Sequence, residues 1–223
     1  MSIVVRKNKE TFKVRVISNN EISDGVYILE TQKTASFLPG QVVAVAMHPD
    51  DNLRLYSLAS GPDAPVFRIL YDIKPDGQLT PHMSKLKLDD FIYISKPFGR
   101  FTDQGQNAWW IATGTGIAPF VSMMEAGQGG NKTLLQGARY INQFYFSDAF
   151  EKNMGDRYLR FCTKETGDGI IHGRLTQFLK ETDKATPDLK YYICGSAEMV
   201  VEARDILIGK GVPFDQIIAE IYF

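Results

Sequence analysis

The sequence has few cysteines, and this scarcity excludes several kinds of redox or metal centre. The two cysteines, Cys162 and Cys194, lie far apart and form no CxxC pair. Their number and spacing argue against a disulfide framework and against a zinc ribbon, and no metal site is predicted. An iron–sulfur cluster normally needs four cysteine ligands. A redox centre in this chain is therefore expected to be organic.

The sequence also lacks a basic excess and long apolar runs. The formal net charge is −1 at pH 7, whereas binding to nucleic-acid phosphates needs a dense basic face, so no nucleic-acid partner is expected. No apolar run approaches the roughly 20 residues that span a bilayer. The start of the chain, MSIVVRKNKE, is not apolar enough for a signal peptide. We expect a soluble cytoplasmic protein without a membrane partner, and a monomer in the simplest case.

Residues 1–103 form a segment rich in β-strand-forming runs. Short runs of branched and aromatic residues recur there, separated by turn-forming segments such as Pro39-Gly40 and Pro75-Asp76-Gly77. This spacing predicts an antiparallel β-barrel. A short helix should follow Thr80, with Thr80 as its N-cap and Pro81 at its first position. The expected strands are Thr11–Ile17, Val26–Glu30, Val42–Met47, Leu53–Leu58, Val66–Tyr71 and Phe91–Ile94.

The pattern changes over residues 104–223, where strand-like and helix-like runs alternate. Such alternation predicts a second, α/β domain with a doubly wound parallel sheet. The expected strands are Ala108–Ala112, Lys132–Ala138, Tyr158–Thr163, Tyr191–Cys194 and Ile217–Ile221. Three helices are expected: one that begins near Pro119, one over Arg174–Glu181 and one over Ala197–Lys210.

One predicted barrel strand carries residue types suited to an aromatic ligand with phosphates. In Arg54-Leu55-Tyr56-Ser57, alternate residues share a face, so Arg54 and Tyr56 should point one way and Leu55 and Ser57 the other. An arginine offers a bidentate fork to a phosphate. A tyrosine ring can stack on an aromatic group, and a serine is a small hydrogen-bond donor. An ordinary amphipathic strand would show the same pattern.

Two glycine-containing turns precede predicted helices, whose free N–H groups can bind phosphates. The first, Asp76-Gly77-Gln78-Leu79-Thr80, fits a plain turn before a capped helix equally well. The second, Thr113-Gly114-Thr115-Gly116-Ile117-Ala118-Pro119-Phe120, follows an apolar strand. This strand–loop–helix context favours a dinucleotide pyrophosphate site. Pro119 stands where the usual fingerprint has a third glycine.

Further candidates follow the later strands, because ligands bind beyond the carboxyl ends of parallel strands. Cys194 ends one strand, and the alternative for it is a buried structural cysteine. Arg139, Lys164 and Arg174 could together hold an adenosine 2′-phosphate, although each alone could be a solvated charge. The chain ends in Tyr222-Phe223, which is either a docked last strand or an aromatic cover on a flat cofactor.

The order of these motifs resembles the ferredoxin–NADP(+) reductase family, in particular its bacterial, FAD-containing type. The resemblance spans nearly the whole chain. It rests on Arg54-x-Tyr56-Ser57, Gly77-x-x-Thr80, Gly114-Thr115-Gly116-Ile117-Ala118-Pro119, Cys194-Gly195 and the aromatic end. It implies that residues 1–103 bind FAD and that residues 104–223 bind NADP(H). It also implies an oxidoreductase that transfers electrons between NADP(H) and a one-electron carrier, ferredoxin or flavodoxin.

The resemblance implies roles for residues on the flavin side. Arg54 would contact the FAD pyrophosphate, Tyr56 would stack on the isoalloxazine ring, and Ser57 would lie near flavin N5. Tyr222 would stack on the outer flavin face, with Phe223 over folded adenine. Gly77 and Thr80 would lie at the pyrophosphate, and Leu55 and Leu79 would supply the remaining cofactor contacts.

The resemblance also implies roles on the nicotinamide side. The Gly114–Pro119 loop, with Gly114, Thr115 and Gly116, would take the NADP pyrophosphate, and Thr113 is a further cofactor-binding candidate. The 2′-phosphate end would be held by Arg139, Lys164 and Arg174, and Thr163 is a further cofactor-binding candidate beside Lys164. Cys194 would lie near the nicotinamide, and Glu220 would tune flavin reduction and proton balance. The implied catalytic set is Ser57, Cys194, Glu220 and Tyr222.

One departure and three alternatives qualify this reading. Thr163-Lys164 stands where similar enzymes have Ser-Arg; lysine loses the planar fork, so the preference for NADPH should be weaker. The alternatives are a free-flavin or quinone reductase, an NADH-dependent electron-transfer component of an oxygenase, and a non-enzymatic sensor that keeps the fold. An acidic carrier would need a basic patch, for which the candidates are Lys85, Lys87, Lys96 and Arg100.

Overall fold

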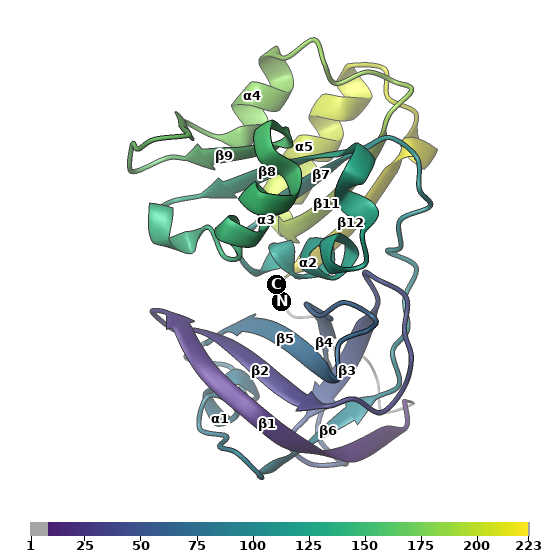
Figure 1. The fold of residues 1–223 in the computed structure, drawn as a ribbon, viewed down its shortest axis with the longest axis vertical. Coiled ribbons are helices and arrows are strands. Elements are labelled where there is room, and N and C mark those ends of the chain that lie inside the picture. The colour runs from purple at the N-terminus through teal and green to yellow at the C-terminus, as the bar shows by residue number, and fades with distance from the viewer. Residues whose placement is uncertain (1–8, 223) are drawn as a thin grey trace. The chain divides into compact units, whose positions relative to one another are not determined.

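The computed structural model describes residues 9–222, drawn in Figure 1, and they divide into two compact units. The first unit comprises the chain up to Thr102 together with Ala118–Ala126. The second comprises Asp103–Ile117 and the chain from Gly127 onward. The sequence-based boundary after residue 103 stays a prediction. Among residues 9–222, no helix is long and apolar enough to cross a bilayer.

The first unit is the antiparallel barrel that the strand spacing predicted. Its strand order is β4-β3-β6-β1-β2-β5. An antiparallel bridge between Leu58 and Ile69 joins the two end strands, and the Ala59 amide donates to the Arg68 carbonyl at 2.7 Å. The strands are β1 (Thr11–Ser23), β2 (Val26–Gln32), β3 (Val42–Ala46), β4 (Arg54–Ser57), β5 (Val66–Asp72) and β6 (Phe91–Ser95).

Alternation along these strands fills the barrel interior with branched and aromatic side chains. Period-two patterning directs every second residue inward, and the buried cluster includes Val14 and Val16 of β1, Val43 and Val45 of β3, and Ile69 of β5. A smaller cluster around Ala44 and Ala46 collects the residues on the other face of β3.

The short helix after β5 differs from the sequence prediction at its first turn. Helix α1 (Thr80–Met83) has Leu79 as its N-cap, so Thr80 is not the N-cap that we expected. The Thr80 hydroxyl instead accepts a hydrogen bond from the Lys74 amide at 2.8 Å. Since the Gly77 amide also donates to the Lys74 carbonyl, the threonine side chain closes the turn that leads into the helix.

The second unit contains the predicted parallel sheet. Its strands follow the order β10-β9-β8-β7-β11-β12 and pair in parallel. The chain runs from β7 outward through β8 and β9 to β10, then returns to place β11 on the other side of β7. The strands are β7 (Ala108–Thr113), β8 (Lys132–Ala138), β9 (Tyr158–Cys162), β10 (Ile170–His172), β11 (Lys190–Ser196) and β12 (Ile217–Tyr222).

Helices cover both faces of this sheet (Figure 1). Helices α4 (Leu175–Glu181) and α5 (Ala197–Gly209) pack on the face that carries Ile111 and Ile193. Helix α3 (Ser147–Met154) covers the opposite face, where its Phe150 ring lies 5.6 Å from the ring of Tyr158. The sequence analysis did not predict α3 or β10.

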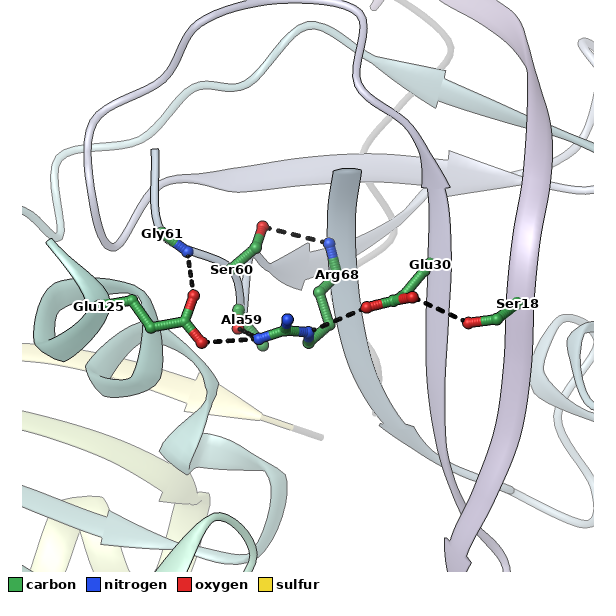
Figure 2. A network of polar contacts seen from close by, with 7 residues as sticks. All are labelled: Ser18, Glu30, Ala59, Ser60, Gly61, Arg68 and Glu125. Atoms are coloured by element: carbon green, nitrogen blue, oxygen red, sulfur yellow. Dashed lines mark hydrogen bonds and ion pairs between the residues drawn. The ribbon is translucent and has the colours of Figure 1, made fainter. Parts of the chain in front are cut away.

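Helix α2 (Ala118–Glu125) belongs to the barrel unit and is held by a polar network at its last residue. Figure 2 shows Arg68 of β5 at the centre of this network, donating to Glu125 at 2.7 Å, to the Ala59 carbonyl at 3.2 Å and to Glu30 at 3.3 Å. Glu125 also accepts from the Gly61 amide at 2.6 Å. The network therefore connects the end of α2 to two strands and a turn of the barrel.

A buried ion pair joins Asp103, the first residue of the second unit, to Lys132, the first residue of β8. Lys132 Nζ lies 2.9 Å from Asp103 Oδ2, and the two side chains are 1% and 0% exposed. The ammonium also donates to the Gln106 carbonyl at 2.8 Å and to the Asn131 side chain. A buried charge needs such partners, because desolvation is costly without them.

We predict that Lys132→Met destabilises the protein strongly, because it leaves the Asp103 carboxylate buried without its counter-charge. The expected loss in the free energy of unfolding is about 3–5 kcal/mol, measured by urea denaturation followed by circular dichroism. Lys152→Met removes an exposed lysine from α3 and should change stability by less than about 0.5 kcal/mol. Equal stability of the two variants would contradict the role given to the buried pair.

Candidate functional site

Strand β4 places the four residues of the first motif on the two faces that its alternation predicts. In the antiparallel register, Tyr56 lies opposite Val43 and Leu55 opposite Ala44. Tyr56 packs against the barrel core, whereas Leu55 packs against the small cluster on the other face. Arg54 shares the side of Tyr56 and is half-buried, while Ser57 is buried. An arginine, an aromatic ring and a hydroxyl thus lie within four consecutive residues.

The segment after β5 lies near the same tyrosine. Burial raises the pKa of the Tyr56 hydroxyl above its usual value, and the negative charge of Asp72 at the end of β5 raises it further. Asp72 leads directly into the Lys74–Thr80 turn described above. The fold therefore brings Tyr56 close to the strand end from which Gly77, Leu79 and Thr80 follow.

Asn19 of β1 secures this segment, and sequence reasoning did not identify it. Its side-chain amide donates to the carbonyls of Met83 and Leu86 at 2.8 and 3.2 Å. Its side-chain oxygen accepts from the Tyr71 hydroxyl at 3.0 Å. These bonds fix the carboxyl end of α1 to the barrel. Only a polar residue inside an otherwise alternating strand could have signalled this role.

In the second unit, the glycine-rich loop packs against the end of β11. Residues Gly114–Ile117 form a 3₁₀ turn directly after β7. A Cβ atom at residue 116 would lie 2.4 Å from the Cys194 carbonyl oxygen and 2.6 Å from Gly195 Cα. Gly116 is therefore needed for contact between two backbones. Gly114 differs: its φ is +55°, and a Cβ atom there would meet open space.

Thr113 and Gly195 form a second close contact, also at the carboxyl ends of β7 and β11. Gly195 has φ +153°, and a Cβ atom at this position would lie 2.3 Å from Thr113 Oγ1. The Ser196 amide donates to that oxygen at 3.4 Å. From β7 the chain continues to β8 on one side, whereas β11 lies on the other side of β7. The contacts therefore lie at the topological switch point, where doubly wound sheets bind their ligands.

Three of the residues with predicted catalytic roles come together beside this loop. The β11–β12 register pairs Cys194 with Glu220 and Ser196 with Tyr222. The Cys194 thiol is fully buried, and burial raises its pKa well above the usual value, with the charge of Glu220 acting in the same direction. A hydrogen bond with the Tyr222 side chain acts in the opposite direction. Cys194 is thus held as a neutral thiol.

The basic residues follow the ends of β8 and β9 at the same edge. The Lys164 amide donates to the Arg139 carbonyl at 3.0 Å, and the Thr163 amide donates to the Ala138 carbonyl at 3.2 Å. Both Arg139 and Lys164 are exposed. The Gly173 amide donates to the Cys162 carbonyl at 2.8 Å, which brings the next residue, Arg174, to this edge as well.

Arg174 has partners that the sequence did not reveal. Its guanidinium lies 2.8 Å from a carboxylate oxygen of Glu198 and 3.6 Å from one of Glu202, both on α5.

The remaining predicted residue, Phe223, lies outside the described residues. Thr115 is half-buried in the 3₁₀ turn between the two glycines.

Comparison with known proteins places these features in a family context. Residues 110–205 match the model of the oxidoreductase NAD-binding domain. A ferredoxin–NADP reductase of Azotobacter vinelandii is 26% identical, with 89% of each chain covered. The electron-transfer component of toluate 1,2-dioxygenase from Pseudomonas putida is 23% identical over 95% of this chain and 67% of its own. The predicted resemblance to the ferredoxin–NADP(+) reductases is confirmed.

A solved structure extends the comparison to the fold. A ferredoxin NADP+ reductase from Neisseria gonorrhoeae, solved with bound FAD and NADP, superposes with a TM-score of 0.86 at 18% identity and covers 96% of this chain and 99% of its own. The predicted combination of an antiparallel barrel and a parallel α/β domain is therefore confirmed. The chain is an oxidoreductase that resembles the ferredoxin–NADP(+) reductases.

We predict that Gly116→Ala destabilises this reductase-like protein, because its methyl group would overlap the Cys194 carbonyl. Overpacking of this kind typically costs about 1–3 kcal/mol, which urea unfolding can measure. Gly130→Ala is the matched control, since a Cβ atom there meets nothing within 4 Å, and a helix-compatible Gly→Ala change is neutral or slightly stabilising. If both variants unfold alike, the backbone contact is not needed.

We predict that the Cys194 thiol resists alkylation in the folded protein. The thiolate is the reactive form, and burial and Glu220 both disfavour it at this position. At pH 8, iodoacetamide should modify Cys194 at least about tenfold more slowly than an unperturbed thiol, whose pKa is roughly 8.5. Peptide mass spectrometry distinguishes Cys194 from Cys162, and labelling in guanidinium chloride supplies the control. Rapid labelling of the folded chain at Cys194 would contradict this environment.

Proposed function

We propose that this protein transfers electrons between NADP(H) and a one-electron protein carrier, a ferredoxin or flavodoxin, with FAD as its resident cofactor. The observation that carries the proposal is the arrangement of residues at the carboxyl ends of β7 and β11, the switch point of the parallel sheet. There the Gly114–Ile117 turn, the neutral Cys194 thiol and the Glu220 carboxylate meet. The FAD and NADP named for the Neisseria relative are consistent with these cofactors.

The barrel residues fit FAD by the chemistry of their side chains. Arg54 would pair with a pyrophosphate oxygen, and the half-buried Tyr56 ring would lie against the flat flavin ring. Ser57 would donate a hydrogen bond to the ring edge. The turn fixed by Thr80 would present its amides to the pyrophosphate. When bound, FAD supplies the exchange between two-electron and one-electron chemistry.

The NAD-binding domain fits a nicotinamide dinucleotide at its carboxyl edge. Open space beside Gly114 leaves its backbone accessible to a pyrophosphate. The Cys194 thiol, which stays protonated, would pack beside the nicotinamide without acting as a nucleophile. Glu220 pairs with Cys194 in the sheet and would hold or release a proton there. Tyr222 would supply an aromatic surface next to this thiol.

The carrier would approach the basic side chains that the barrel exposes. The barrel exposes Lys85, Lys87, Lys96 and Arg100, and cations suit an acidic ferredoxin or flavodoxin. An NADH-dependent reductase component of an oxygenase is the second candidate. It is favoured by the capture of Arg174 by two glutamates and by the similarity to the toluate dioxygenase component.

The deciding experiment follows the flavin spectrum of the purified protein during anaerobic reduction. We expect a yellow protein that NADPH bleaches faster than NADH, because Arg139 and Lys164 attract the additional phosphate. The reduced protein should then reduce cytochrome c rapidly only after ferredoxin or flavodoxin is added. Free FMN added in place of the carrier serves as the control for the flavin-reductase alternative.

Each other outcome points to a different function. Faster bleaching by NADH would favour the oxygenase-type reductase. Rapid reduction of added FMN together with loss of FAD on purification would favour a flavin reductase. A colourless protein that binds no added FAD would overturn the proposal, and a stable flavin that neither nucleotide bleaches would indicate a sensor.

A further inference from the structure

Within residues 9–222, Arg174 is the only one of the three predicted phosphate-binding cations whose side chain forms an ion pair. Its guanidinium contacts Glu198 at 2.8 Å and Glu202 at 3.6 Å. The two glutamates lie one helical turn apart on α5, so both carboxylates reach the same guanidinium. No such pair involves Arg139 or Lys164 among the described residues.

All three side chains remain in contact with water. Arg174 is 60% exposed, and Glu198 and Glu202 are 74% and 40% exposed. Exposed pairs are individually weak and are screened by salt. The glutamates can therefore bias where the guanidinium lies, but a phosphate of higher charge can compete with them. The arrangement is adjustable and not locked.

The position of the glutamates matters because of the anion proposed to bind there. Glu198 stands in the first turn of α5, directly after the Cys194-Gly195-Ser196 strand end. The hydrogen bond from the Gly173 amide to the Cys162 carbonyl places the next residue, Arg174, beside the carboxyl end of β9. A 2′-phosphate that approached Arg174 would meet two carboxylates of the same sign as itself. A ribose with a free 2′-hydroxyl would meet no such repulsion.

We infer that Glu198 and Glu202 are specificity-determining residues that oppose the 2′-phosphate by holding the Arg174 guanidinium and adding negative charge beside it. The inference rests on the proposed function, because it assumes that a nicotinamide dinucleotide binds at this edge. It predicts that the chain's discrimination between NADPH and NADH is smaller than its three cations alone would give.

The test measures nucleotide binding directly, without electron transfer. Adenosine 2′,5′-bisphosphate and 5′-AMP are titrated into the FAD-loaded protein at low ionic strength by isothermal calorimetry. Glu198→Gln and Glu202→Gln should each tighten the bisphosphate by about threefold to fivefold, as expected for exposed charge pairs. Neither change should alter the affinity for 5′-AMP by more than about twofold.

Matched controls isolate the interaction with Arg174. Asp205→Asn removes one negative charge from the same helix, but that carboxylate pairs with Arg204 at 2.8 Å, so the bisphosphate affinity should not change. In an Arg174→Ala background, the gain from Glu198→Gln should shrink, because the released guanidinium is absent. The gain should also decline as salt is added.

The outcomes separate this inference from the proposed function. If the wild type binds neither nucleotide, the proposed function fails. If both nucleotides bind but both glutamine variants leave the bisphosphate affinity unchanged, the inference fails while the function stands. Weaker bisphosphate binding by Glu198→Gln would also overturn the inference, because the glutamate would then position Arg174 for the phosphate.

Discussion

The contact between the Gly116 and Cys194–Gly195 backbones is the constraint on which the nicotinamide side of this protein depends. A side chain cannot be accommodated at Gly116, and Gly195 meets Thr113 just as closely. The turn after β7 and the end of β11 are therefore fixed to each other through main-chain atoms. Register then carries the constraint to β12, because Cys194 pairs with Glu220. The thiol, the carboxylate and the loop are consequently positioned by backbone packing, whichever nucleotide binds.

Helix α2 continues from this loop, yet its far end is held by the barrel. A glutamate in the last turn of a helix is electrostatically unfavourable, since the helix dipole is negative there. Glu125 is stabilised at that position by Arg68 at 2.7 Å and by the Gly61 amide at 2.6 Å (Figure 2). Charge-assisted bonds of this kind are stronger than neutral ones, so they can offset the dipole. The residue that ends α2 thereby ties this helix to the strands of its own unit.

The sequence was informative where one residue type decides the local structure, and less so where partners are distant. Branched and aromatic runs predicted strands such as β3 and β8 to within a residue or two, because burial and alternation act locally. Helix α3 was missed because it begins after Phe146 in a left-handed conformation, without a side-chain cap, and β10 because it has three residues. Thr80 was assigned as a cap, but its hydroxyl bonds the Lys74 amide. Asn19 went unnoticed because its partners lie more than 50 residues away.

The same reasoning explains why a phosphate site is harder to infer than a fold. The motif supplies the identity of a cation, but the field that a ligand experiences also includes the cation's own partners. Arg174 and Glu198 are 24 residues apart and meet only through the packing of α4 and α5. A carboxylate within hydrogen-bond distance opposes the arginine's field, and salt screens such exposed charges over a Debye length of about 8 Å at physiological ionic strength. In the proposed site, specificity would therefore depend on the sum of charges that the folded sheet assembles, of which Arg174 is one part.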